Sequence, residues 1–289
     1  MHIARSTKCL ATMSSLLRVV SPDMLFVSEP NPMMFGNGKN TPGKKSWSNE
    51  SDNWLKSRFH FSFAEYHNPR NSKFGVLRVM NDDFVQPDRG FGTHGHSNME
   101  IVTYVVDGEL SHADSNGNEE ALGRGSVQFM SAGRGVRHSE FNNSPDSPLR
   151  FIQMWVTPRE MNIPSNYGSL KGDYKARCNK WQHLVSDRNS TFNTPIKIVQ
   201  DANFYVAELD AGVSVKLGLA SGRQAYALCI EGAIEIGTTG KDSSEEAELE
   251  RHAAAELFGK AEITFTATSK GAHILVVEMN HDGSSRFKR

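Results

Sequence analysis

This sequence has few cysteines, no long apolar run and almost no net charge. Each of these features excludes a class of protein. The three cysteines, Cys9, Cys178 and Cys229, are too few and too far apart for a disulfide framework or a paired-cysteine zinc site, and they fit a reducing compartment. No apolar run approaches the ~20 residues that a membrane-spanning helix needs. The 32 Lys and Arg balance 33 Asp and Glu, so no overall basic field attracts nucleic acid or an anionic membrane. We therefore expect neither a membrane nor a direct nucleic-acid partner.

Acidic residues are also absent from the first 22 residues, which contain Arg5, Lys8 and Arg18 together with several Ser and Thr. This composition is typical of an organelle transit peptide, and the alternative interpretation is a disordered terminus. The apolar run within it is too broken for the core of a secretory signal. We expect a cytoplasmic or nuclear protein, with a plastid or mitochondrion as the alternative compartment.

The chain does contain a repeated pattern of short strands. From residue 59 to residue 158, segments rich in β-branched and aromatic residues, such as 74–85 and 100–106, are separated by clusters of Gly, Pro, Asn and Asp. Strands at this spacing, roughly ten residues apart, are typical of an all-β sandwich or barrel. Asp107-Gly108 predicts a two-residue hairpin turn between two of them.

The second half repeats this character after residue 195. Residues 225–237, AYALCIEGAIEIG, echo residues 103–114 as strand, acidic-Gly turn and strand, which suggests two similar β domains. The stretch 243–260 has helical propensity, but in this setting we expect a long loop with at most one or two helical turns.

A length of 289 residues suits two domains, because a single core seldom grows past about 250 residues. We predict an N-terminal extension over residues 1–50, a first domain over 51–160, a connection over 161–190 and a second domain over 191–289.

The candidate chemistry is concentrated in two short segments. His94 and His96 flank Gly95, and His138 and Glu140 flank Ser139. On a strand, side chains at i and i+2 share a face, so each pair can present both of its groups to one centre. Three imidazoles and a carboxylate suit a divalent transition metal and leave coordination positions free for water, O2 or substrate.

Other residues compete for these roles. A lone His-x-His pair is often two unrelated histidines, and Glu100, four residues after the first pair, offers another carboxylate. His112 is the remaining competitor. The hairpin expected at Asp107-Gly108 pairs it with Thr103, away from the first histidine pair, so we interpret it as a structural histidine near Asp114.

Residues 91–142, FGTHGHSNMEIVTYVVDGELSHADSNGNEEALGRGSVQFMSAGRGVRHSEFN, resemble the signature stretch of the pirin family. The likeness extends from about residue 59 to residue 158 and weakens through the second half. It implies a bicupin, in which two jelly-roll β-barrel domains pack together and the first holds a single metal ion. The ligands that it implies are His94, His96, His138 and Glu140. Glu100 would then lie near the metal without binding it.

One departure from the pirin pattern is visible. Gly95 stands where pirins commonly have Pro, which loosens the turn but removes no ligand. The second domain has no comparable set of His and Glu, so we predict that it is metal-free.

The resemblance also implies a reaction, because pirins resemble quercetinases. We expect opening of the ring of a flavonol such as quercetin by O2, with release of carbon monoxide and with Glu140 as the general base for the 3-hydroxyl. The expected cofactor is one divalent transition metal, iron(II), with manganese, nickel, copper or zinc as alternatives. The expected apolar walls of the substrate pocket are Phe91, Met99, Phe129 and Met130.

The alternative function is non-enzymatic: an iron-dependent redox sensor whose metal state alters a surface that contacts transcription factors or other proteins. Arg89, Arg134 and Arg137 would supply such a surface. The expected partners are therefore a small flavonol-like aromatic substrate with O2, or a protein. We expect a monomer, since two β domains can close on each other within one chain.

Overall fold

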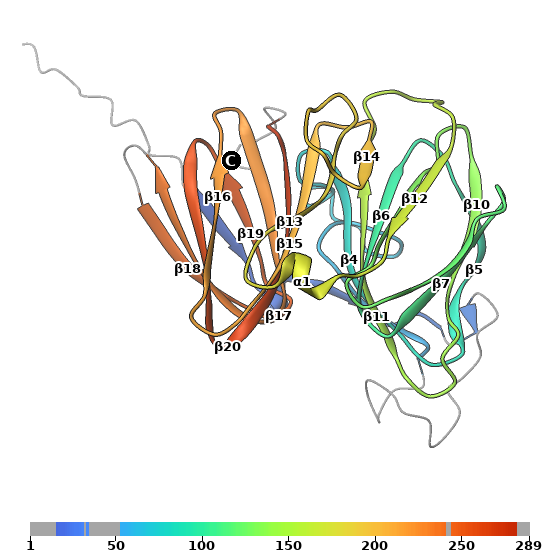
Figure 1. Ribbon diagram of the computed structural model, residues 1–289. Coiled ribbons are helices and arrows are strands. Elements are labelled where there is room, and N and C mark those ends of the chain that lie inside the picture. Colours follow the sequence, from blue (N-terminus) through green and yellow to red (C-terminus); the bar gives the residue numbers. More distant parts are fainter. Residues whose placement is uncertain (1–15, 32, 35–52, 241–243, 282–289) are drawn as a thin grey trace, which may run out of the picture.

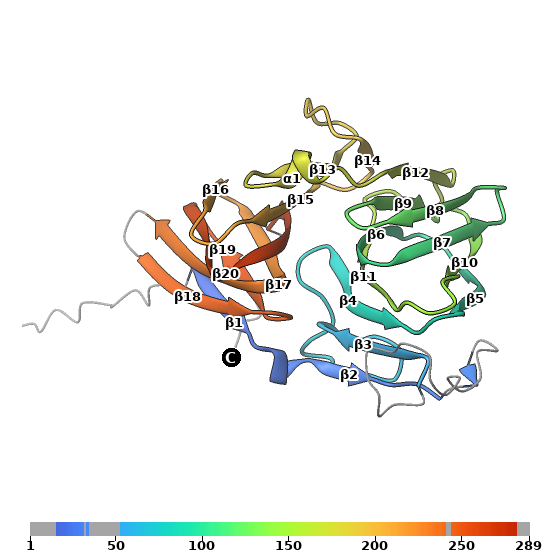
Figure 2. The ribbon, with the colours of Figure 1, turned by 60° about the horizontal axis from the view of Figure 1, so that its bottom comes forward.

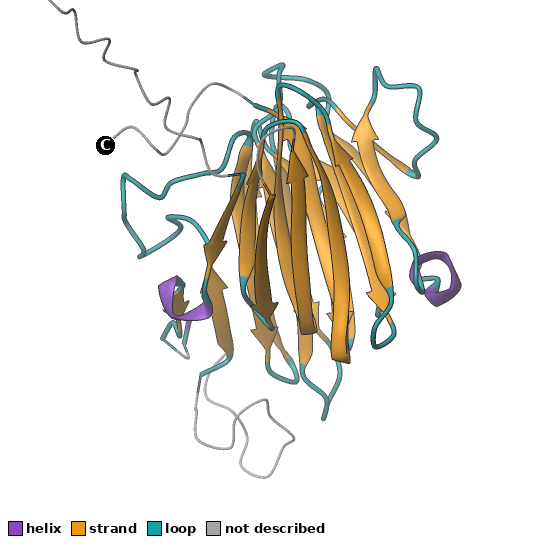
Figure 3. Ribbon diagram, turned by 90° about the vertical axis from the view of Figure 1, so that its left-hand side faces the viewer, coloured by secondary structure: helices purple, strands orange, loops and turns teal. Residues whose placement is uncertain are grey.

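The expected all-β architecture of two packed domains is confirmed by the computed structural model, which describes residues 16–31, 33–34, 53–240 and 244–281. The two domains lie side by side (Figure 1). Helical structure in the described ranges is limited to short segments such as η1 (Pro22–Met24) and α1 (Tyr174–Arg177), at the margins of the strands (Figure 3). None of the described helices is long and apolar enough to span a membrane.

The N-terminal domain consists of two sheets that face each other. The larger sheet contains β2 (Phe26–Ser28), β3 (Leu55–Phe59), β4 (Leu77–Val85), β6 (Glu100–Asp107), β9 (Val127–Ser131), β11 (Leu149–Val156) and β12 (Asn166–Leu170), in the order β12-β9-β6-β11-β4-β3-β2. The smaller sheet contains β5 (Arg89–His96), β7 (Glu109–Asp114), β8 (Glu119–Gly123) and β10 (Val136–Asn142), in the order β5-β10-β7-β8.

The C-terminal domain is a single strongly bent sheet. Its strands are β1 (Leu17–Val20), β13 (Gln182–Asp187), β14 (Ile196–Ile198), β15 (Ala202–Leu209), β16 (Ser214–Leu219), β17 (Arg223–Gly240), β18 (Ser244–Glu250), β19 (Ala254–Phe258) and β20 (Ala261–Asn280). The order is β1-β19-β17-β20-β15-β13-β14, with β16 on β20 and β18 on β17. Because β17 and β20 pair along most of their length, they run through the whole domain.

The N-terminal segment joins the two domains. Strand β1 pairs with β19 of the C-terminal sheet, and β2 pairs with β3 of the N-terminal sheet. In Figure 2 the blue segment crosses from one domain to the other between these strands. The domain boundaries stay a prediction, but residues 17–28, within the expected extension 1–50, contribute strands to both domains. The interpretation of the first 22 residues as a transit peptide falls largely outside the described residues.

The hairpin predicted at Asp107-Gly108 is wrong, because β6 and β7 belong to different sheets. Gly108 has a φ of +78°, and the chain turns there from the larger sheet into the smaller one. The echo at Glu231-Gly232 has a similar character. Gly232 has a φ of +71° and interrupts the β17–β20 register, while β17 continues beyond it. Both acidic-Gly pairs therefore mark bends and not two-residue hairpin turns.

The loop expected over 243–260 is also wrong, since the described part of it forms β18 and β19. Exposed residues alternate with less exposed ones along β18, and Leu249 is buried, which is the pattern of a strand with one face toward a core. Pairing with β17 and β1 outweighs the local helical propensity of this Ala- and Glu-rich stretch.

The domains share one hydrophobic core. Met80 of β4 and Ile152 of β11 pack in the same cluster as Phe204, Tyr226 and Val277 of the C-terminal sheet. Successive residues of a strand point to opposite faces of the sheet. The residues next to Met80 in β4 and next to Ile152 in β11 therefore point into the N-terminal domain. This alternation places polar side chains inside the first domain.

Charged pairs join the domains beside this core. Arg150 donates two hydrogen bonds of 2.8 Å to Asp82 and a third to the carbonyl of Ile230, and His252 lies 2.6 Å from Asp82. Burial opposes ionisation of Asp82, but Arg150 and His252 outweigh it and lower the pKa of the carboxyl.

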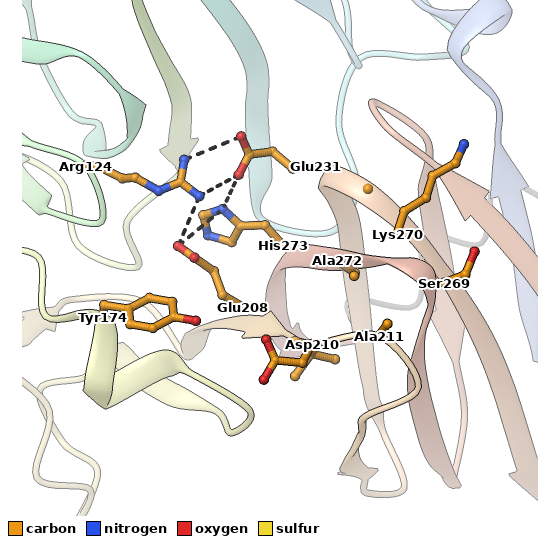
Figure 4. Close-up of a pocket in the computed structure, with 13 residues that line it drawn as sticks. Arg124, Tyr174, Glu208, Asp210, Ala211, Glu231, Ser269, Lys270, Ala272 and His273 are labelled. Atoms are coloured by element: carbon orange, nitrogen blue, oxygen red, sulfur yellow. Dashed lines mark hydrogen bonds and ion pairs between the residues drawn. The ribbon is translucent and has the colours of Figure 1, made fainter.

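A second polar cluster at the interface is drawn in Figure 4. Arg124 of the N-terminal domain lies 2.7 Å from Glu231 and 3.3 Å from Glu208 of the C-terminal domain. His273 lies between Glu231 and the Tyr104 hydroxyl, at 3.1 Å and 2.9 Å. These contacts fix how the first domain, which holds the candidate site, sits against the second.

Candidate metal centre

Three histidines converge where β5 and β10 pair. His138 lies opposite His94, and Val136 lies opposite His96. The ring centroids of the three imidazoles are separated by 4.6 Å to 4.9 Å. One ring nitrogen of each lies within 4.8 Å of the others, and the Nε2 atoms of His94 and His138 are 3.2 Å apart.

Glu140 reaches the same region through a bulge in β10. The register shifts between His138 and Glu140, so that Glu140 lies opposite Phe91. Its buried carboxylate accepts hydrogen bonds from the side-chain amides of Gln128 and Gln153, at 3.0 Å and 2.9 Å. These bonds fix the orientation of the carboxylate.

The four predicted ligands therefore lie together, in two overlapping groups. His94, His96 and Glu140 line one cavity, and His138 belongs both to the three-histidine group and to a group with Glu140 and His112. That these four residues are the metal ligands stays a prediction.

Burial keeps two of the three imidazoles, those of His96 and His138, neutral. Burial, followed by the neighbouring histidines, lowers the pKa of both His96 and His138 to about 3. His94 Nδ1 lies 2.8 Å from the carbonyl oxygen of Gly92. Since a carbonyl only accepts, Nδ1 carries the proton and the electron pair of Nε2 faces the other two rings.

These donors suit a divalent metal. Neutral imidazole nitrogens beside a carboxylate are common ligands of iron, nickel, copper and zinc. The buried Nδ1 of His138 has no hydrogen-bond partner among the residues that the structure describes. A close set of nitrogen electron pairs is satisfied by a cation, so the residues present fit the implied metal.

The interpretation of His112 needs partial correction. Its Nε2 lies 3.6 Å from Asp114, as expected, but the side chain is also opposite Glu140 in the β7–β10 pair and belongs to a candidate ligand group. The hairpin expected at Asp107-Gly108 would have placed His112 opposite Thr103 of β6. In the structure His112 lies in the smaller sheet, next to Glu140. The register of β7 against β10 could not be read from local sequence.

Glu100 makes an interdomain contact. Its Oε1 accepts a hydrogen bond of 2.6 Å from the backbone N–H of Val199, and its side chain is fully buried. Burial raises the pKa of this carboxyl to about 7. Glu100 belongs to neither candidate ligand group, so this contact gives it a structural role between the domains.

A cavity of about 230 Å³ opens onto His94, His96 and Glu140. Its apolar walls include Trp54, Phe59, Phe63, Phe91 and Trp155, and its polar lining includes Asn81, Asp83 and Gln153. Of the four walls predicted, only Phe91 lines this cavity. Met99, Phe129 and Met130 pack in hydrophobic clusters instead.

Both candidate ligand groups found among the described residues belong to the N-terminal domain. In the C-terminal domain, His252 and His273 are engaged with Asp82 and with Glu231 and Tyr104. That the second domain binds no metal stays a prediction.

Two family models match the two domains. The model described as Pirin matches residues 43–156, and the model described as Quercetinase C-terminal cupin domain matches residues 184–279. The expected pair of cupin domains is therefore confirmed.

Known proteins are similar to between 42% and 91% of this chain. A pirin-like protein of Caulobacter vibrioides is 37% identical over 226 residues, which cover 77% of this chain and 92% of that protein. Quercetin 2,3-dioxygenase of Escherichia coli is 47% identical over 120 residues, 42% of this chain and 52% of that enzyme. The structure of YhhW, a bacterial pirin of Escherichia coli in complex with nickel(II), matches with a TM-score of 0.72 and 26% identity, over 91% of this chain and 99% of that one.

Proposed function

Because this chain belongs to the pirin family, we propose that it is a metal-dependent dioxygenase that opens the ring of flavonols such as quercetin. His94, His96, His138 and Glu140 would hold one divalent metal, with iron(II) as the active ion. The relative named quercetin 2,3-dioxygenase supports the reaction, and the nickel(II) complex of a pirin supports a metal in this fold.

One observation carries the proposal: His94, His96 and the oriented carboxylate of Glu140 line a cavity with aromatic walls, and His138 lies beside the other two histidines. Flat aromatic ligands need apolar cover with a few well-placed polar groups. The rings of Trp54, Phe91 and Trp155 provide this cover, and they exclude water from the polar end of the cavity.

The bound metal would supply positive charge for a substrate oxyanion and, as iron(II), a route by which electron density passes from the substrate to O2. The protein's own groups prepare the substrate. Glu140 would accept the proton of the flavonol 3-hydroxyl as a general base, while Gln128 and Gln153 keep its carboxylate from rotating away. The aromatic walls hold the flavonol ring in the plane that brings this hydroxyl to Glu140.

The test is turnover by iron(II)-loaded protein supplied with quercetin in air. We expect O2 uptake and carbon monoxide release in equal amounts, both absent without O2 or in His94→Ala protein. Binding of quercetin without any gas exchange would remove the dioxygenase proposal.

The alternative function, an iron-dependent redox sensor that binds protein partners, has its own support. Arg134 and Arg137 are exposed, and a surface depression of about 330 Å³ is lined by both Arg137 and His96. A partner seated there would therefore lie next to a predicted ligand. Partner capture with iron(II) and iron(III) protein tests this, since identical sets of bound proteins would contradict a sensor.

A further inference from the structure

One wall of the cavity carries polar groups that the proposed chemistry does not use. Asn81 and Asp83 are alternate residues of β4, and both side chains line the cavity. They come from the larger sheet, whereas His94, His96 and Glu140 come from the smaller sheet. A ligand between the two sheets can therefore contact both sets.

These two side chains are buried, and one of their polar atoms is unpaired. Asn81 and Asp83 are 3% and 4% exposed. The Oδ1 atom of Asn81 has no hydrogen-bond partner within the described part of the chain. Gln153, on the neighbouring strand, is different because it already bonds Glu140 and Thr103. Buried polar groups normally have partners, so an unpaired amide oxygen on a residue that lines a cavity points to a ligand.

The charge around Asp83 fits a neutral, hydroxyl-bearing ligand. Burial, with smaller contributions from the charges of Asp82 and Glu140, raises the pKa of this carboxyl to about 8 and outweighs the hydrogen bond with Ser57, which lowers it. At neutral pH most of the Asp83 side chains are therefore protonated. In that state the group can both donate a hydrogen bond to a phenol oxygen and accept one from a phenol hydroxyl.

We propose that Asn81 and Asp83 form a second recognition point, which binds a hydroxyl of the aromatic substrate other than the one presented to Glu140. This inference rests on the proposed function and narrows its substrate class. The site would select flavonols with several hydroxyl groups over a flavonol whose only hydroxyl is the one on the central ring.

The test is anaerobic binding of two flavonols to nickel(II)-loaded protein, so that no turnover occurs. Quercetin has additional hydroxyls on both outer rings, and 3-hydroxyflavone has none. We expect Asp83→Ala to weaken quercetin binding about tenfold, the loss of one hydrogen bond to a buried carboxyl. It should leave the affinity for 3-hydroxyflavone within about twofold, because that ligand makes no such bond. Asp83→Asn, which retains a hydrogen-bonding group, should show a smaller selective loss.

The matched control is Glu109→Ala, which removes an exposed carboxyl from β7 outside the cavity and should change neither affinity. Nickel content and melting temperature establish that each variant is folded and loaded. Should Asp83→Ala not fold, Asn81→Ala replaces it, with the same selective loss of quercetin affinity expected.

An equal change for both flavonols, or no change for either, would overturn the second recognition point. Failure of wild-type protein to bind quercetin would remove both this inference and the flavonol proposal. A selective loss of quercetin affinity without carbon monoxide release in air would contradict the dioxygenase reaction alone.

Discussion

His138 lies directly opposite His94 in the β10–β5 pair, and their Nε2 atoms are 3.2 Å apart. Two imidazole nitrogens this close can share a proton or a cation. Because His94 already uses its Nδ1 on the Gly92 carbonyl, its remaining electron pair faces His138.

The first prediction concerns this pair. His94→Ala should reduce the metal bound per chain at least about tenfold at limiting metal, since it removes one of the predicted ligands. Elemental analysis after loading with iron(II) or nickel(II) measures this. His67→Ala, which changes an exposed histidine, should leave the metal content unchanged. Equal metal content in all three proteins would contradict the ligand assignment.

Glu140→Gln tests the carboxylate. In the wild-type protein the side-chain amides of Gln128 and Gln153 donate to the two oxygens of Glu140. A glutamine at this position has a single oxygen, so it can accept through one side-chain atom only. We expect quercetin turnover to fall about 100-fold or more, because the proton acceptor is lost. Steady-state O2 uptake by protein of known metal content gives the comparison, with Glu109→Gln as the control. Normal turnover in Glu140→Gln protein would show that the base lies elsewhere.

His112→Gln separates support from coordination. His112 stacks on Tyr167 at 4.9 Å and lies 3.5 Å from the Gln128 amide that bonds Glu140. We expect the metal content to stay at the wild-type level, and kcat to fall about tenfold because Glu140 loses its fixed orientation. A loss of metal as large as in His94→Ala protein would make His112 a ligand.

Asp82 gives the protein a defined response to acid. The folded state lowers the pKa of Asp82 below its unfolded value of about 3.9, so on acidification the unfolded chain binds the proton first. The stabilisation is therefore complete above about pH 5 and decreases as the pH falls below about 4. Urea denaturation between pH 3 and pH 7, run as a series of about five pH values, measures this loss of unfolding free energy.

Asp82→Asn should cost about 3–5 kcal/mol at neutral pH, since Arg150 is left buried without its partner. The variant should also lose less stability on acidification than the wild type. Glu262→Gln, which breaks an exposed pair with Lys216, should change the unfolding free energy by no more than about 1 kcal/mol. Equal effects of the two substitutions would contradict a structural role for the buried pair.

Local patterns predicted the strands and the histidine pairs, because alternation and i,i+2 spacing are properties of one strand. They did not predict which strands pair. Asp107-Gly108 has the composition of a hairpin turn, yet the positive φ of Gly108 belongs to a bend between two sheets. Because a hairpin was predicted there, His112 was placed away from the candidate site. Residues 244–258 have helical composition, yet their pairing partners make them strands.

The cavity walls show the same limit. Trp54 and Trp155 come from segments far from the histidine motif in sequence, and they reach the cavity only because two sheets face each other. Met99 and Phe129 are close to that motif but point into other clusters. Separation in sequence from the histidine motif therefore did not predict which residues lie close to the candidate metal site.

The shared core has a consequence for any attempt to divide this molecule. Met80 and Ile152 of the N-terminal domain pack in one cluster with Phe204 and Val277 of the C-terminal domain. Separating the domains would therefore expose a large hydrophobic surface on each of them to water. We therefore expect neither domain to fold stably on its own. The C-terminal domain, in which we predict no metal, permanently covers the outer apolar face of the larger N-terminal sheet, and heating should unfold both domains in a single cooperative step.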